Sequence, residues 1–129
     1  MRLRIFVSLA VMFALPGLTG CETTPKQRIQ GKWVGEGVEN FPAGHAERAQ
    51  GWASGSSFEF VGSRVTVTIP AERPRQGTFK IQQATEAGMQ LAFLRPHGSS
   101  DEVAFQFEGE DRMRWLLGDG RSIVMRKAD

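Results

Sequence analysis

The C-terminal stretch EVAFQFEGEDRMRWLLGDGRSIVMRK, residues 102–127, decides the fold. Apolar side chains occupy every second position in three short runs, which are separated by EGED at 108–111 and GDG at 118–120. A period of two is that of a β-strand with one apolar face, because a helix repeats about every 3.6 residues. Connections this short cannot hold a crossover helix, so consecutive strands should pair antiparallel.

The same alternation extends back to residue 32 and predicts eight strands. Six phenylalanines fall on the apolar faces, whereas Thr, Gln, Lys and Arg fall on the opposite faces. We expect an all-β domain, an antiparallel up-and-down meander that closes into a small barrel, with an incompletely closed sheet as the alternative. The predicted strands are residues 32–39, 57–61, 64–70, 77–83, 89–94, 102–108, 112–117 and 121–127.

The connections between these strands differ in length in a regular way. Loops on a rigid scaffold are where binding sites concentrate, so the end of the barrel with the long loops is the expected site of any ligand. The connections at the long-loop end are residues 40–56, 71–76, 95–101 and 118–120. Those at the other end are residues 62–63, 84–88 and 109–111.

Residues 1–20 have the order of a secretory signal peptide. Arg2 and Arg4 precede an apolar run of eleven residues, Ile5 to Leu15. A membrane-spanning helix needs about 20 apolar residues, so this run is too short to be a permanent anchor. We expect the segment to be removed from the mature protein.

The end of this signal, Leu18-Thr19-Gly20-Cys21, resembles the lipobox of bacterial lipoproteins. The resemblance implies that Cys21 takes a diacylglyceryl group after cleavage before it. Residue 22 is Glu, whereas Asp at that place resembles an inner-membrane retention signal, so the resemblance implies an outer-membrane anchor facing the periplasm. Cys21 is the only cysteine, which leaves the domain without a disulfide or a cysteine metal site.

The mature chain divides into an anchor and one domain. Residues 21–30, the lipidated cysteine followed by a polar stretch, are predicted to be a tether that reaches at most about 30 Å. Residues 31–129 are enough for one barrel domain and too few for two. Without Arg2 and Arg4, basic and acidic side chains are equal in number, and nothing indicates nucleic-acid binding.

Gly31-Lys32-Trp33 opens the first predicted strand, and Arg126-Lys127 closes the last. This arrangement resembles that of lipocalins and lipocalin-like proteins, in which a basic side chain of the final strand covers the indole of a G-x-W motif at the closed end. The resemblance implies a barrel-floor pair of Trp33 and Arg126, or Lys127 in its place, stabilised by cation–π attraction. The strands are shorter than those of lipocalins, so the interior should be filled or hold one small ligand.

The long loops supply a set of candidate ligand-binding residues. Residues 43–50 could form a short helix, with Phe41 and Trp52 folding over the barrel mouth as a lid or plugging the open end of the core. Lids of this kind gate ligands in the resembled family. The candidate set is Phe41, His45, Trp52, Arg95 and His97.

Charged side chains at the same end allow other sites. Arg73, Arg75 and Arg95 could offer fork-shaped donors to a carboxylate or phosphate, or simply be solvated. His45 and His97 could form a metal or acid–base site with Glu47 or Asp101, or be two solvated histidines. The sequence contains no G-x-S-x-G, H-E-x-x-H or P-loop motif, so we expect neither an enzyme nor a cofactor.

The leading hypothesis is a noncatalytic, membrane-tethered barrel that binds an apolar small molecule or lipid at the long-loop mouth. The alternative is an interaction module, a hydrolase inhibitor or envelope-assembly partner, that uses these loops or the barrel exterior. Periplasmic lipoprotein inhibitors of lysozyme or proteases have a comparable architecture, but they commonly carry a disulfide that this chain cannot form. Leu94 and Leu116, predicted on outward faces, are the first candidates for such an exterior surface.

Overall fold

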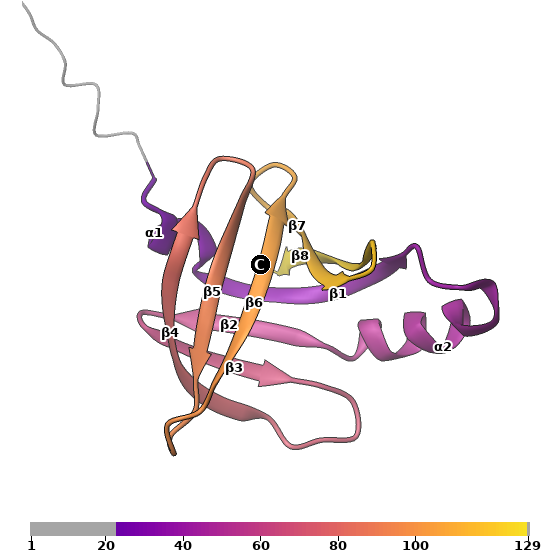
Figure 1. The fold of residues 1–129 in the computed structure, drawn as a ribbon, viewed down its shortest axis with the longest axis horizontal. Coiled ribbons are helices and arrows are strands. Elements are labelled where there is room, and N and C mark those ends of the chain that lie inside the picture. Colours follow the sequence, from indigo (N-terminus) through magenta and orange to yellow (C-terminus); the bar gives the residue numbers. More distant parts are fainter. Residues whose placement is uncertain (1–22, 129) are drawn as a thin grey trace, which may run out of the picture.

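The computed structural model describes residues 23–128 and shows a closed barrel of eight antiparallel strands (Figure 1). Each strand pairs with the next in the chain, and β8 pairs with β1 to close the sheet. The predicted closed meander is therefore confirmed, whereas the signal peptide, the lipobox and Cys21 lie outside the described residues. The strands are β1 Gly31–Glu39, β2 Ser57–Val61, β3 Arg64–Thr68, β4 Arg75–Ala84, β5 Gly88–Leu94, β6 Ser100–Phe107, β7 Arg112–Gly118 and β8 Arg121–Ala128.

Aromatic side chains fill much of the barrel interior. Phe58 packs edge-on against Phe105 with ring centroids 5.4 Å apart, and Phe60 packs edge-on against Phe79 at 5.1 Å. This geometry is favoured because the positive edge of one ring meets the negative face of another. The six phenylalanines predicted to point inward are all buried: Phe58, Phe60, Phe79, Phe93, Phe105 and Phe107.

A short helix, α1 (Pro25–Ile29), closes the floor of the barrel. Thr24 accepts a hydrogen bond from the Gln27 backbone N–H, and the Gln27 side chain accepts one from the Thr24 N–H, which is a capping box. Ile29 at the end of α1 is fully buried. The tether predicted over residues 21–30 therefore ends earlier than expected, because the chain from Pro25 onward is part of the folded domain.

The floor pair is Trp33 with Lys127. The Trp33 Nε1–H donates to the Ile29 carbonyl oxygen at 2.9 Å, and Lys127 Nζ lies 5.0 Å from the indole centroid. Arg126, named from the sequence as the partner, instead lies 3.3 Å from a Glu36 carboxylate oxygen on the outer face. The reason is strand alternation: Trp33 is opposite Lys127 in the β1–β8 register, so those two side chains share the inner face.

The second helix, α2 (Ala43–Ser54), lies in the β1–β2 connection at the opposite end of the barrel from α1 (Figure 1). It is longer than the predicted helix over 43–50. Its last turn touches β1 so closely that a Cβ at Gly35 would lie 1.8 Å from the Ala53 carbonyl oxygen. No helix within residues 23–128 is long and apolar enough to cross a membrane.

Every buried side chain of residues 23–128 falls between Ile29 and Met125. A chain that begins at residue 22 therefore keeps the whole core, the closing β1–β8 pairing and both helices. Because consecutive strands run antiparallel around the closed meander, the four connections predicted at the long-loop end do share one end of the barrel.

Candidate functional site

A first cavity opens at the long-loop end of the barrel, between β3, β4, β5 and β6. Its volume is about 270 Å³. The wall is apolar because the inward-facing side chains of these strands remain apolar up to the barrel mouth. The apolar side chains that line the cavity include Phe58, Val65, Val67, Phe93, Val103 and Trp115.

The rim of this first cavity carries balanced charge. An Arg95 Nη2 atom lies 2.7 Å from Asp101 Oδ2, and Arg75 Nη2 lies 2.6 Å from Glu72 Oε1. The predicted grouping of three arginines at one end is therefore observed, but two of them already bind carboxylates. The charged side chains that line the rim are Arg73, Arg75, Arg95, Glu72, Asp101 and Glu102.

A second cavity, of about 350 Å³, lies between α2 and the hairpin formed by β7 and β8. Its base is largely apolar, and basic groups reach it from both elements. No Asp or Glu among residues 23–128 lines it. The side chains that line it include Phe41, His45, Arg48, Trp52, Leu117 and Arg121.

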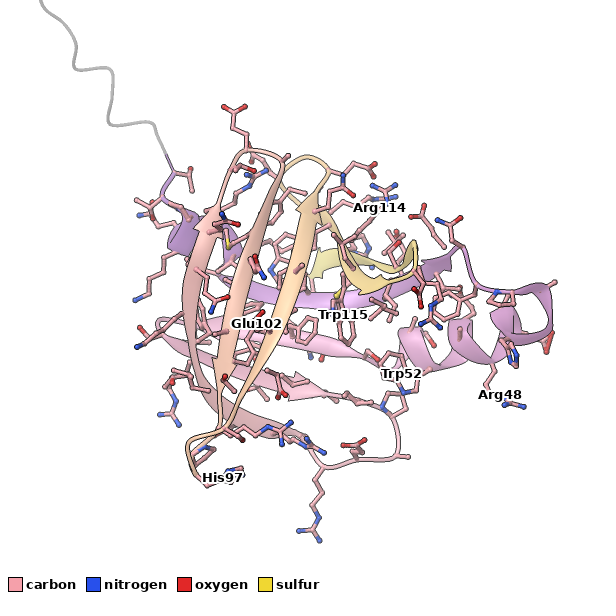
Figure 2. All side chains as sticks on the ribbon, viewed as in Figure 1. Arg48, Trp52, His97, Glu102, Arg114 and Trp115 are labelled. Carbon is pink, nitrogen blue, oxygen red and sulfur yellow. The ribbon has the colours of Figure 1, made fainter. Side chains whose placement is uncertain are left out.

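Two tryptophans form the wall between the two cavities. Trp115 lines the first cavity and Trp52 lines the second. Their rings lie 5.9 Å apart at an angle of 31°, and Trp115 also packs edge-on against Phe58 at 4.9 Å (Figure 2). Of the two arrangements that the sequence allowed, a lid over the mouth or a plug of the open end, Trp52 is closer to the plug, because it packs against the core. Trp52 and Phe41 also line a separate cavity beside the first.

The five predicted ligand-binding residues are distributed over three places. Arg95 lines the first cavity, whereas Phe41, His45 and Trp52 line the second. His97 lines neither and sits in the exposed β5–β6 turn, with Nδ1 3.4 Å from Ser99 Oγ. The two histidines thus share no cavity, and within residues 23–128 no three His, Cys, Asp or Glu side chains gather closely enough to hold a metal ion.

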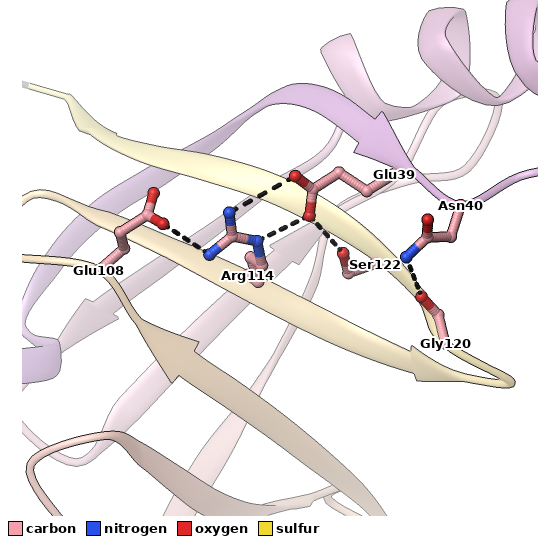
Figure 3. A network of polar contacts seen from close by, with 6 residues as sticks. All are labelled: Glu39, Asn40, Glu108, Arg114, Gly120 and Ser122. Carbon is pink, nitrogen blue, oxygen red and sulfur yellow. Dashed lines mark hydrogen bonds and ion pairs between the residues drawn. The ribbon is translucent and has the colours of Figure 1, made fainter.

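A polar network on the outer wall holds the closing strands together (Figure 3). The Arg114 guanidinium donates to Glu39 Oε1 at 2.6 Å and to Glu108 Oε2 at 2.8 Å, and the Ser122 hydroxyl donates to Glu39 Oε1 at 3.1 Å. The hydrogen bond from Arg114 lowers the pKa of Glu39, and both carboxylates raise the pKa of Arg114. Glu39, the carboxylate that accepts from the Ser122 hydroxyl, also accepts from Arg114, and the lowered pKa makes it a weak base, so the geometry supports a structural role.

Sequence reasoning missed the two basic residues of the second cavity, Arg48 and Arg121. Both residues could have been named from the sequence, because Arg48 lies in the predicted helix and Arg121 directly follows a connection assigned to the long-loop end. What the sequence could not supply was the packing that turns Trp52 toward Trp115. Comparison of the chain with protein-family models, curated proteins and solved structures gave no match, so the two cavities carry the argument about ligands.

Proposed function

We propose that the protein is a noncatalytic lipoprotein of the bacterial outer membrane, facing the periplasm, whose barrel binds a small apolar molecule in the first cavity. The observation that carries this proposal is an apolar wall that reaches the surface at the long-loop end. Burying apolar surface there is favourable by about 25 cal/mol per Å². Since the rim carries as many carboxylates as arginines, it offers no net attraction to an ion, and the preferred ligand is neutral.

The size of the first cavity limits the ligand. About 270 Å³ is just below the range of roughly 300–1,000 Å³ that is usual for small-molecule sites. A cavity of about 150 Å³ already accommodates benzene. The cavity therefore suits one substituted aromatic ring or a short alkyl chain, and it would accept only the end of a lipid acyl chain.

The N-terminal segment supports an orientation for this barrel. If Cys21 carries the lipid, the chain between it and α1 spans at most about 15 Å, because α1 begins at Pro25. α1 lies at the floor, so the floor would face the membrane and the mouth would face away from it. A ligand could then reach the first cavity from the periplasm.

The cavity is tested with the chain from residue 22 onward and toluene as the probe. Val67 lines the cavity, whereas Val61 is 63% exposed on the outer face of β2. The Val67→Phe variant fills the cavity, and Val61→Phe adds the same ring outside it as a matched control. We expect saturable shifts of the Val65 and Val103 methyl resonances in the unaltered chain and in Val61→Phe, and their loss in Val67→Phe.

Two results would contradict ligand binding in the first cavity. One is the absence of saturable methyl shifts in the unaltered chain, and the other is an unchanged toluene affinity in Val67→Phe. Native mass spectrometry is a separate measurement: applied to the chain from residue 22, purified from its own host, it would detect a natural apolar ligand that survives purification.

The anchor is tested separately, on the full chain expressed in its host. We expect intact-mass measurement to show a chain that begins at Cys21 and carries acyl groups, and fractionation to place it in the outer membrane. The Cys21→Ser variant should lose the acyl mass and leave that fraction. An unacylated chain cut at another position would contradict the lipoprotein proposal without affecting the cavity.

The alternative function, an interaction module, finds less support on the barrel exterior. The exposed large apolar side chains within residues 23–128 are Val61, at 63%, and Leu116, at 42%. They stand on β2 and β7, which are not neighbours in the sheet, so they do not form one continuous patch. Leu94 is half-buried and lines the first cavity.

A further inference from the structure

The second cavity combines an apolar base with unbalanced positive charge. Phe41, Trp52 and Leu117 supply apolar surface between α2 and the β7–β8 hairpin. Arg48 reaches the cavity from α2, and Arg121 from the start of β8. The first cavity has a carboxylate for each arginine, whereas within residues 23–128 the second cavity has none among its lining side chains.

Arg121 is the more informative of the two cations. Its guanidinium carbon lies 5.5 Å from the Phe41 ring centroid, and its Nε is buried without a hydrogen-bond partner among residues 23–128. Within residues 23–128 its one ion-pair partner is Asp119, whose carboxylate oxygen lies 3.7 Å from Arg121 Nη2 and whose side chain is 89% exposed. Such an exposed, long contact is weak, so the guanidinium retains donors for an anion.

We propose that the second cavity is a binding site for a small organic carboxylate with an aromatic body, held by Arg121 and Arg48 at its charged end and by Phe41, Trp52 and Leu117 along its ring. Guanidinium donors match a carboxylate in geometry and charge. The volume of about 350 Å³ accommodates one or two fused rings. This site is distinct from the first cavity, because the Trp52–Trp115 pair stands between them.

The proposal is tested by calorimetric titration of the chain from residue 22 with 2-naphthoate and with 2-naphthalenemethanol. The two probes share the ring system, and only the acid is charged. We expect the acid to bind at least about tenfold more tightly, because a hydrogen bond to a charged group is stronger than one to a neutral group; tenfold corresponds to about 1.4 kcal/mol. Equal affinities for the acid and the alcohol would overturn the proposal.

Variants locate the binding. Arg121→Gln and Arg48→Gln should each weaken 2-naphthoate binding about tenfold, because each removes one charged donor. Arg48 is exposed on α2, so Arg48→Gln remains informative even if Arg121→Gln destabilises the hairpin. Arg64→Gln, on an exposed position of β3 outside the cavity, is the control and should bind as the unaltered chain does. Unchanged binding in Arg48→Gln would contradict the assignment.

The proposals for the two cavities can be tested independently of each other. Ala49 is half-buried on α2 and lines only the second cavity, so Ala49→Phe should abolish 2-naphthoate binding and leave toluene binding intact. Val67→Phe should do the reverse. If Val67→Phe abolished binding of both probes while Ala49→Phe affected neither, the proposed second site would be wrong and the first cavity would hold both ligands.

Discussion

The two ends of the barrel differ in how a helix covers the apolar interior (Figure 1). At the floor, the five residues of α1 place the fully buried Ile29 under the barrel, next to the fully buried Trp33. At the open end, the twelve residues of α2 bury one side chain completely, that of Ala53. Each helix thus buries one side chain completely, but α2 uses twelve residues to bury the small Ala53, whereas α1 uses five to bury the larger Ile29.

The reason lies in what each helix does with its apolar residues. α1 directs Ile29 inward and ties its end to the β2–β3 turn, where the Gln30 side chain both donates to and accepts from the Gly62 backbone. α2 uses Trp52 and Ala49 to line a cavity and is held to β1 by backbone approach at Gly35. The floor is thus built for packing, whereas the open end keeps apolar surface accessible, as binding sites do.

The comparison predicts its largest effect for matched tryptophan substitutions. Trp33→Ala at the floor should lower the free energy of unfolding by about 3–5 kcal/mol, because it leaves a cavity and an unpaired Ile29 carbonyl. Trp115→Ala should cost about 1–2 kcal/mol, because this half-buried ring already borders a cavity. Urea unfolding of both variants measures the difference. Equal losses would mean that the two ends are packed alike.

A second pair of substitutions tests how α2 is held. Gly35→Ala should lower the free energy of unfolding by about 1–3 kcal/mol, because its Cβ would overlap the Ala53 carbonyl oxygen and force the helix away. Gly37→Ala should change it by less than about 0.5 kcal/mol, since that Cβ would meet Gln50 Oε1 at 3.6 Å, an ordinary contact. Thermal unfolding measures both. Similar midpoints for the two variants would contradict the close approach.

Much of the floor and the barrel wall could be predicted from the sequence. The alternation of Phe105 and Phe107, or of Ile123 and Met125, fixes which residues point inward without any knowledge of the rest of the fold. The same rule, applied to the end of the last strand, places Lys127 inward and Arg126 outward, so the sequence could have decided between these two candidates for the floor pair. α1 also had a local signal, since Thr24 and Gln27 have the capping-box spacing.

The candidate site could be predicted only in part. The sequence located the end of the barrel that carries both cavities, because loop lengths alternate along a meander. It could not show that the site is divided, since this depends on how Trp52 of α2 meets Trp115 of β7 across a long connection. Helix periodicity predicts on which face of a helix a residue lies, but not which other element that face contacts. For the same reason, Arg48 and Arg121 could not be paired from the sequence.

A smaller effect is expected from the cation at the floor. Lys127→Met should keep the apolar stem over Trp33 but lose the cation–π attraction, which lowers the free energy of unfolding by about 0.5–1 kcal/mol. Arg126→Met removes only an exposed pair with Glu36 and should cost less than about 0.5 kcal/mol. Urea unfolding of the two variants distinguishes them. A larger loss in Arg126→Met would return the floor role to Arg126.

The smallest predicted effect concerns acid stability near the open end, where Glu39 ends β1. Its hydrogen bond from Arg114 lowers the pKa of Glu39 in the folded chain below the ordinary value of 4.5. The stabilisation is therefore complete above pH 4.5 and is lost as the pH falls from there through the lowered pKa. Glu39→Gln removes this contribution, so the stability difference from the unaltered chain should shrink over that interval.

Glu47→Gln on the exposed surface of α2 is the control for this measurement, because Glu47 forms no ion pair within residues 23–128. This substitution removes one surface carboxylate without touching the Arg114 network, so it measures the effect of the charge change alone. Urea midpoints taken at several pH values provide the comparison. If the stability difference between Glu39→Gln and the unaltered chain stayed constant on acidification, the charge of Glu39 would not stabilise the closing strands through Arg114. The outer network would then make no pH-dependent contribution to the stability of the open end.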